Sequence, residues 1–368
     1  MRLLAGIRVV ELPDGLVDLG GRMLAELGAE VVSIVGEDAE RPHARCLAWH
    51  HGKRRVTVAQ GDADRLARLI AEADIVLDGR LGGMRHALGE LSAANPGLVQ
   101  VVAVPFGTEG ARTDWPASDL TLMAMSGLMH ITGDPERPPL RLPGEQAFAL
   151  TGIQVATAAL LGLRARRRTG RGQRIDVSAY QATTLANYRE PVVYAWTGRI
   201  GRRTGNRLVR GKTGVRQIWP CADGFVTWSI IDNPGMMRSV VATMAEHGAA
   251  GELAEVDWEA ILVADAPEET IARWEAPVGA FFAAHDRATL GCWSLARGWG
   301  LSVIADLDDV RASRHLAARG LFVDVADEET GRTARLPGPL FRHGADHDAP
   351  PRRLARPVRL ADAGWSKR

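Results

Sequence analysis

Short apolar runs alternate with helical segments through the first hundred residues, and this alternation restricts the possible folds more than any other feature of the chain. Runs rich in Val, Ile and Leu predict strands at residues 7–12, 31–35, 73–78 and 98–104. Helical patterns fall between them, at residues 19–27, 65–72 and 84–94. Strands that are apolar throughout are typical of parallel sheets whose two faces are both covered by helices. We therefore expect an α/β fold with a doubly wound parallel sheet.

Two helices and a strand extend this pattern. The run S-D-L-T-L-M-A-M-S-G predicts a compact helix that Ser118 or Asp119 can cap, because a short side-chain oxygen accepts from the first free N–H groups. An Ala/Leu-rich stretch predicts a long helix at residues 151–167, with arginines in its last turn and Gly170 as its cap. The run I-D-V-S at 175–178 predicts a further strand.

The composition changes near residue 190. A Gly/Arg-rich loop occupies 198–216, and an Asp-Gly step between apolar runs at 219–229 predicts a hairpin. Trp- and Ala-rich helical stretches follow at roughly 236–316, and the last fifty or so residues return to strand and loop. This change indicates a second, smaller domain of the α+β type.

Bulk composition excludes several classes of function. The formal net charge of the 368 residues is +1, so no global field favours nucleic acid or an anionic membrane surface. Cys46, Cys221 and Cys292 have neither a metal-binding nor a disulfide spacing. No apolar stretch reaches the roughly 20 residues of a membrane span, and the first residues lack a signal-peptide pattern. We expect a cytoplasmic protein with no metal site.

Several segments carry a family resemblance, and the most recognisable is R-T-G-R-G-Q-R-I-D-V-S at 168–178. Other segments agree in order and spacing: L-A-G-I-R-V-V-E-L at 4–12, L-A-E-L-G-A-E-V-V-S-I at 24–34, H-H-G-K-R-R-V-T-V at 50–58, W-P-C-A-D-G at 219–224 and G-R-T-A-R-L-P-G-P at 331–339. Together they resemble the class III (CaiB/BaiF type) CoA-transferase family, which includes formyl-CoA and carnitine CoA-transferases and α-methylacyl-CoA racemase.

The resemblance implies an architecture and a substrate. Members of that family have a large CoA-binding domain built from both chain ends, here residues 1–190 and 325–368, with a small domain inserted, here 191–324. Their ring-like chains thread through each other as an interlocked dimer. Coenzyme A, bound as an acyl-CoA, is a substrate together with a small carboxylic acid, and no cofactor is held covalently.

The resemblance also implies a catalytic carboxylate. In the family an aspartate attacks the acyl-CoA thioester and becomes a mixed anhydride, which divides one difficult exchange into two easier ones. Counting back from T-G-R-G-Q places this aspartate at Phe148, or at Ala147 with a one-residue shift, and neither side chain can be acylated. The nearest carboxylate is Glu145, our candidate catalytic residue. The alternative is that Glu145 is a solvated loop residue or a helix-start charge.

Racemase chemistry is disfavoured by the same comparison. It needs a His as well as an Asp to exchange the α-proton, and the position of that His is Ser118. His130 lies nearby in the sequence, but a His among apolar residues is more often packed in a core.

Cations near the strand ends are candidates for the CoA phosphates, which need charged donors at several points. Lys53 and Arg54 stand in the family motif G-K-R-R, where the alternative is a solvated charge run. Arg85 follows the third predicted strand. Arg41 and Arg45 follow the second, where ligands bind beyond the carboxyl ends of parallel strands.

Three functions remain open from the sequence. The first is a CoA-transferase that acts on a small carboxylic acid. The second is a catalytically silent CoA-binding subunit that pairs with an active paralogue, so the dimer is either a homodimer or a heterodimer. The third is an acyl-CoA isomerase or lyase on the same scaffold. No dinucleotide fingerprint, phosphate-binding loop or metal cluster points to a further cofactor.

Overall fold

The computed structural model describes residues 2–35, 43–59, 61–79, 94–209, 213–338 and 353–366. The chain divides into two compact units. Unit 1 comprises Met1–His130, Arg141–Gly201 and Arg314–Arg368, and unit 2 comprises Ile131–Leu140 and Arg202–Ser313. The domain limits expected near residues 190 and 324 stay a prediction.

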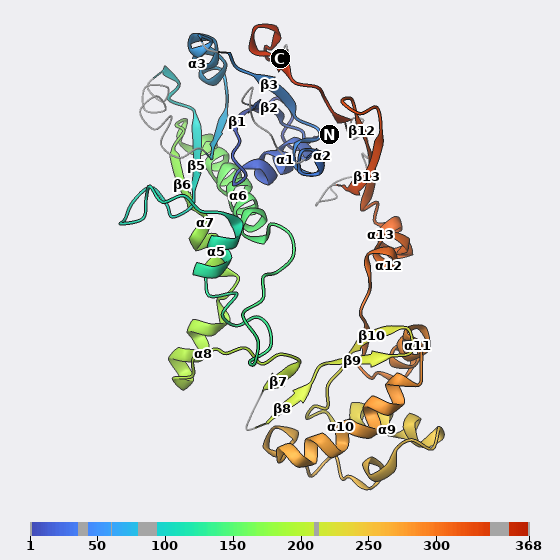
Figure 1. The fold of residues 1–368 in the computed structure, drawn as a ribbon. Helices are drawn as coiled ribbons and strands as arrows, with labels where there is room; N and C mark the ends of the chain where they lie inside the picture. Colours follow the sequence, from blue (N-terminus) through green and yellow to red (C-terminus); the bar gives the residue numbers. More distant parts are fainter. Residues whose placement is uncertain are drawn as a thin grey trace. The chain divides into compact units, whose positions relative to one another are not determined.

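Unit 1 is built on a seven-stranded sheet in the order β15-β3-β2-β1-β4-β5-β6, in which every neighbouring pair is parallel (Figure 1). The strands are β1 (Arg8–Leu12), β2 (Glu30–Val35), β3 (Arg54–Thr57), β4 (Ile75–Asp78), β5 (Val99–Val104), β6 (Arg174–Ser178) and β15 (Val358–Arg359). The predicted α/β fold with a parallel sheet is therefore confirmed. The interlocked dimer stays a prediction.

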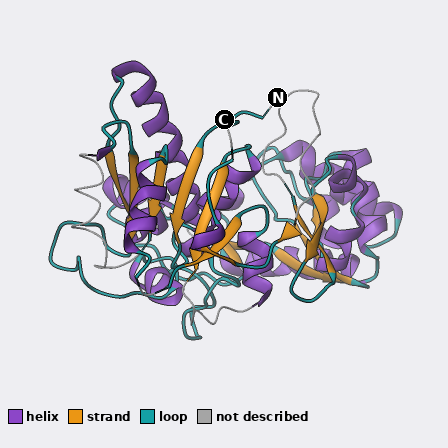
Figure 2. Cartoon of the chain, turned by 90° about the horizontal axis from the view of Figure 1, so that it is seen from above, coloured by secondary structure: helices purple, strands orange, loops and turns teal. Residues whose placement is uncertain are grey.

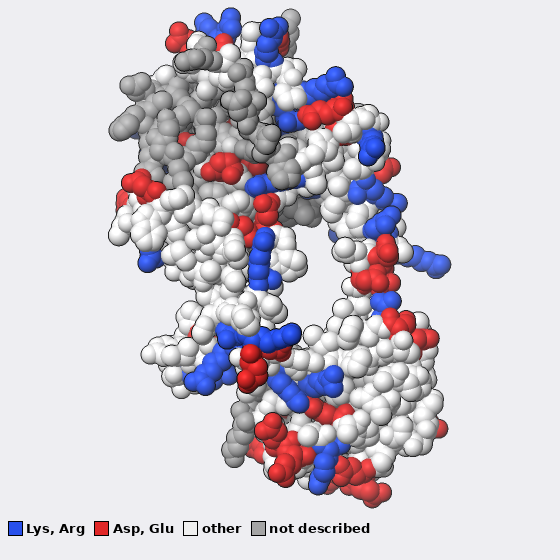
Figure 3. Space-filling model, in the orientation of Figure 1, with Lys and Arg blue, Asp and Glu red and all other residues white. Residues whose placement is uncertain are grey.

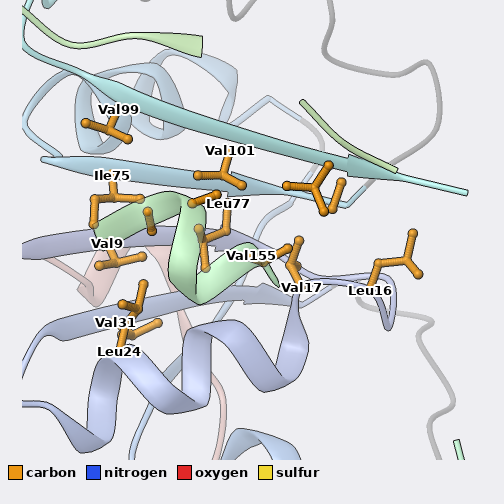
Figure 4. Packing of buried hydrophobic residues seen from close by; sticks show 14 of the residues in the cluster. Val9, Leu16, Val17, Leu24, Val31, Ile75, Leu77, Val99, Val101 and Val155 are labelled. Atoms are coloured by element: carbon orange, nitrogen blue, oxygen red, sulfur yellow. The ribbon is translucent and has the colours of Figure 1, made fainter. Parts of the chain in front are cut away.

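Both faces of this sheet are buried, as the continuously apolar strands predict. Adjacent residues of a strand point to opposite faces, so Val9 packs into one core and Val10 into the other. Figure 4 shows the first of these cores, in which Val9, Val31 and Ile75 pack with residues of neighbouring strands and helices. This burial on both sides explains why the central strands β4 and β5 are almost wholly apolar.

Helices cover the two faces of the sheet (Figure 2). The first core includes residues of α1 (Asp18–Glu26) and α6 (Gln146–Thr169), and the second includes residues of α3 (Ala63–Ala71). The remaining helices of unit 1 are α2 (His43–His50), α5 (Asp119–Met125), α7 (Ala179–Leu185), α8 (Arg189–Thr197), α13 (Arg314–Ala318) and the short η3 (Leu360–Asp362). The helix predicted at 84–94 falls almost wholly outside the described residues.

Helix α6 is the long helix that the sequence predicts, and Gly170 ends it with a φ of 71°, in the left-handed region. It begins at Gln146 rather than at 151. Within the described ranges it is also the one helix long and apolar enough to cross a membrane. Its buried residues pack against α1, β5 and β6, and this packing accounts for its composition. Gly152 lets α1 approach closely, since a Cβ there would lie 2.7 Å from Leu19 Cβ.

The end of the chain adds to unit 1. Strand β15 pairs with β3 at the edge of the main sheet. A second, three-stranded sheet has the order β13-β12-β14 and comprises β12 (Phe322–Asp327), β13 (Thr333–Pro337) and β14 (Arg353–Leu354). The return to strand structure expected for the last fifty or so residues is thus observed.

Unit 2 has small antiparallel sheets packed against helices. Its strands are β7 (Arg207–Val209), β8 (Gly214–Arg216), β9 (Ile218–Cys221), β10 (Gly224–Thr227) and β11 (Ser302–Val303). Its helices are α9 (Pro234–Glu246), η1 (Gly251–Glu255), η2 (Val263–Asp265), α10 (Glu268–Ala283), α11 (Arg287–Arg297) and α12 (Leu307–Ala312). Strands β9 and β10 form the hairpin predicted from the Asp-Gly step. Trp219 and Phe282 meet edge to face in its core.

Charged side chains of both signs are interspersed over the face shown in Figure 3. This mixture agrees with the formal net charge of +1. Recognition of an anion therefore depends on particular cations rather than on a general field.

Candidate functional site around Gly15, Arg45 and Glu145

The candidate site lies where the strand order of the main sheet reverses. Strand β1 pairs with β2 on one side and with β4 on the other. The chain leaves β1 towards β2 and leaves β4 towards β5, so these two connections run to opposite sides. In open parallel sheets, ligands bind beyond the carboxyl ends of the strands at such a switch point. The loop at 13–17 leaves β1 at this position, and Gly79 follows β4.

Gly15 brings three elements together at this loop. Its φ is 115°, a conformation that side chains with a Cβ rarely adopt. A Cβ at this position would lie 2.5 Å from Arg45 Nη2 and 2.9 Å from Phe148 Cε2. The loop after β1 therefore contacts α2 and the first turn of α6 directly, and only glycine fits.

Glu145 is the N-cap residue of α6, although its side chain makes no capping hydrogen bond. Its side chain is 34% exposed, and Oε1 lies 3.2 Å from Arg45 Nη1. The ion pair distinguishes Glu145 from a fully solvated loop residue, whereas its N-cap position agrees with the alternative of a helix-start charge. Its catalytic role stays a prediction.

Ala147 and Phe148 occupy the place where the family resemblance puts an aspartate. Ala147 is fully buried in the core of unit 1. The half-buried ring of Phe148 packs against the same core, and its N–H donates to Asp119 Oδ1 at 3.1 Å. A hydrocarbon ring therefore fills the position beside Gly15.

Arg45 is held between two aromatic rings. Its guanidinium carbon lies 4.8 Å from the Trp49 ring centroid and 5.4 Å from that of Phe148. Nε and Nη2 are buried, and neither has a hydrogen-bond partner in the described part of the chain. The sequence analysis predicted that Arg45 contacts phosphate, and it did not predict that Arg45 lies beside Glu145. The available signal was the spacing of Arg45 and Trp49, which places both on one face of a helix.

Asp119 supports the start of α6 from a different element. Ser118, not Asp119, caps α5, since the Ser118 hydroxyl accepts from the Thr121 N–H. Asp119 instead accepts the N–H of Phe148 through Oδ1. Its Oδ2 is buried without a hydrogen bond among the described residues and lies 4.0 Å from Arg141 Nη2.

Lys53 is enclosed in unit 1, which argues against the predicted phosphate contact. Its side chain is fully buried, and Nζ donates to both carboxylate oxygens of Glu11 at 2.8 and 2.6 Å and to the Asp18 carbonyl at 2.6 Å. A buried ammonium needs such partners, and here they surround it. In this structure Lys53 therefore joins β3 to β1 and α1 rather than facing a ligand.

The same buried network includes the side chains of His50 and Asp18. His50 Nε2 lies 3.2 Å from Asp18 Oδ2, and Asp18 Oδ1 accepts from the Gly15 N–H. Burial raises the pKa of the Glu11 carboxyl from 4.5 to about 7, with Lys53 opposing the rise and the Asp18 charge adding to it. The signal in the sequence was a Glu between the apolar residues Val10 and Leu12 of β1.

The other predicted phosphate contacts have different outcomes. Arg54 is partly exposed on β3 and pairs with Glu30 at 3.0 Å, so its role in CoA binding stays a prediction. Arg41 and Arg85 lie outside the described residues.

His130 is exposed, so the expectation that it is packed in a core is wrong. The described ranges contain no group of three or more metal-ligating side chains.

The family model for CoA-transferase family III matches residues 4–357, nearly the whole chain. The chain belongs to CoA-transferase family III. The resemblance deduced from the sequence is thus confirmed, and the Gly15 loop and the start of α6 belong to a family III scaffold.

Curated relatives agree with this assignment. The chain is 30% identical over 323 residues to succinyl-CoA–D-citramalate CoA-transferase of Chloroflexus aurantiacus, covering 77% of this chain and 80% of the relative. It is also 30% identical over 268 residues to the BbsE subunit of succinyl-CoA:(R)-benzylsuccinate CoA-transferase of Thauera aromatica. That second alignment covers 66% of this chain and 63% of the relative, less than two thirds of its length.

Solved structures share the fold of this family III chain. A CaiB/BaiF family protein from Brucella suis matches with a TM-score of 0.77 at 24% identity, covering 93% of this chain and 92% of the other. The protein Rv3272 of Mycobacterium tuberculosis matches with a TM-score of 0.76 at 20% identity, covering 95% of each chain.

Proposed function

We propose that this protein moves CoA between small carboxylic acids and that Glu145 is the carboxylate that carries the acyl group. The observation that carries the proposal is the position of Glu145. It starts α6 just ahead of the residue that stands in the place of the family aspartate, and it is ion-paired with Arg45 beside the Gly15 loop.

The proposed reaction begins when a Glu145 oxygen attacks the thioester carbonyl carbon of the acyl-CoA. A C–O bond forms, the C–S bond breaks, and CoA leaves as the thiolate. The thiolate then attacks the Glu145 carbonyl carbon of the mixed anhydride, which releases the first acid and leaves a glutamyl-CoA thioester. The acceptor acid reverses these two steps. Arg45 is paired with Glu145 at the start, and no redox change or external proton is required.

The relatives suggest the substrates to test first. Their names specify succinyl-CoA as the donor for D-citramalate and for (R)-benzylsuccinate. A third relative, from Agrobacterium fabrum, is named succinate–glutarate CoA-transferase and is 30% identical over 263 residues. We therefore propose succinyl-CoA as the donor and a small dicarboxylic acid as the acceptor, with Arg54, Arg41 and Arg85 as the proposed phosphate contacts.

A second candidate function is a CoA-binding subunit that pairs with an active paralogue. The Phe148 ring at the family's aspartate position favours it. So do the names of relatives that work as subunits, among them the α and β subunits of succinyl-CoA–L-malate CoA-transferase of Chloroflexus aurantiacus. The isomerase or lyase alternative has no comparable support.

Either function is proposed to operate in a dimer. No residue of α8 is buried in the single chain, and Trp196 on this helix is 86% exposed. Large exposed aromatic side chains mark surfaces that a partner covers. The partner is a second copy in the first function and a paralogue in the second.

Replacing Glu145 by Gln tests the first function. The amide keeps size and polarity but cannot form an anhydride, so we expect loss of transfer from succinyl-CoA to glutarate with CoA affinity retained. Glu72→Gln is the matched control, because Glu72 is exposed, follows α3 and pairs with Arg8 at the amino end of β1. Full transfer by Glu145→Gln would exclude Glu145 as the nucleophile. Wild type that transfers only after a paralogue is added would favour the second function.

A further inference from the structure

The free edge of Arg45 is the strongest unassigned feature of the site. A guanidinium donates two parallel hydrogen bonds from the edge formed by Nε and the neighbouring Nη, and this fork matches a carboxylate. In Arg45, Nη1 faces Glu145, whereas Nε and Nη2 are buried with no hydrogen-bond partner among the described residues. One complete two-donor edge is therefore unused.

This edge is also fixed in direction. The guanidinium lies over the rings of Trp49 and Phe148, and Gly15 closes one side of it, since a Cβ there would come within 2.5 Å of Nη2. Attraction between the cation and the faces of these two rings favours this position of the guanidinium. Buried donors without a partner are costly, so an acceptor that reaches them gains more than it would on a solvated arginine.

The charges around Arg45 favour a carboxylate over a phosphate. Glu145 already places one negative charge 3.2 Å from Nη1. A second anion on the same guanidinium meets repulsion from Glu145, which is smaller for a singly charged carboxylate than for a doubly charged phosphate monoester.

We propose that the Nε–Nη2 edge of Arg45 binds the carboxylate of the acceptor acid and holds it beside Glu145. This inference rests on the proposed CoA transfer, in which the acceptor carboxylate must reach the carbonyl carbon of Glu145. It assigns Arg45 to acid recognition rather than to the CoA phosphates.

The test measures acid binding without turnover. Succinate, glutarate and acetate are titrated separately into wild type, Arg45→Lys and Arg45→Gln by isothermal calorimetry, and CoA is titrated into the same proteins. We expect Arg45→Gln to weaken binding of the acids at least tenfold and to leave CoA affinity within twofold of wild type. Arg45→Lys keeps the charge but not the two parallel donors, so its affinity for the acids should lie between those of wild type and Arg45→Gln.

Arg216→Gln is the matched control. Arg216 also stacks on a ring, 4.8 Å from the Trp219 centroid, but its Nε already donates to the Ile218 carbonyl. This variant should bind the acids as wild type does. Circular dichroism and thermal unfolding confirm that each variant is folded, and Arg45→Lys, which retains the cation, serves as the informative variant if Arg45→Gln does not fold.

Three results would overturn the inference: unchanged acid binding by both Arg45 variants, a loss of CoA affinity in place of acid affinity, or no binding of any of the three acids to wild type. The outcome is independent of the nucleophile. If Glu145→Gln still transfers CoA, the proposed role of Glu145 fails, whereas the binding experiment still decides the role of Arg45.

Discussion

Glu11 shows how a single residue links the core of unit 1 to its candidate site. Its carboxylate is buried and bonded to Lys53, which also holds the Asp18 carbonyl, and Asp18 in turn accepts the Gly15 N–H. Only glycine fits at position 21 beside the Glu11 carboxylate, since a Cβ there would lie 1.7 Å from Glu11 Oε2. The network fixes the loop on which Gly15 meets Arg45.

The raised pKa of Glu11 predicts a pH-dependent stability. A carboxyl whose pKa rises from 4.5 to about 7 binds its proton more tightly in the folded protein. Its contribution is fully present below pH 4.5 and is lost as pH rises towards about 7. Urea unfolding should therefore show the Glu11-linked free energy of unfolding falling between these pH values. Glu11→Gln should flatten this part of the profile. A variant whose profile matches that of wild type would contradict the shift.

The start of α6 is the element on which the site depends. Its first turn presents Glu145, buries Ala147 and places Phe148 against Gly15, and the acceptor for the Phe148 N–H comes from Asp119 on α5. Helices need such acceptors for their first N–H groups. Here the acceptor is supplied by a residue distant in the chain.

Removal of the Asp119 carboxylate, which accepts the Phe148 N–H, should destabilise the start of α6. Asp119→Ala is expected to lower the free energy of unfolding by about 1 kcal/mol, as loss of a cap does. Asp119→Asn keeps an acceptor oxygen and should stay close to wild type. Denaturant unfolding measures both. Equal stability of Asp119→Ala and wild type would show that the contact does not anchor α6.

The sequence predicts this fold better than it predicts this site. Strands β4 and β5 were predictable because they are almost wholly apolar, a pattern typical of burial on both faces. Strands β3 and β15 were not predicted, because both are short and carry arginines. The beginning of α6 was not predictable, because Asp119, which accepts the hydrogen bond of the Phe148 N–H, is 29 residues away from Phe148. The proximity of Arg45, Glu145 and Gly15 was equally hidden, because three different elements must fold before these residues meet.

At the scale of the whole molecule, the proposed account needs an assembly. The exposed aromatic residues of α8 and the family's interlocked architecture both favour a dimer. Chains that thread through each other separate only by unfolding, so stability and association are coupled.

Sedimentation over a wide range of dilution tests this expectation. We predict dimers at every concentration at which the protein stays folded, and monomer only where circular dichroism shows loss of structure. A folded monomer at low concentration would exclude interlocking. Co-expression with a paralogue, followed by mass analysis of the complex, distinguishes a homodimer from a heterodimer.

The acylation of Glu145 is the central claim, and trapping it is the most direct measurement. Wild-type protein is incubated with succinyl-CoA, treated with hydroxylamine, digested and analysed by mass spectrometry. The account predicts a hydroxamate on the peptide that contains Glu145, absent when succinyl-CoA is omitted and absent from Glu145→Gln. An unmodified Glu145 in protein that transfers CoA under the same conditions, or a hydroxamate on a different carboxylate, would contradict it.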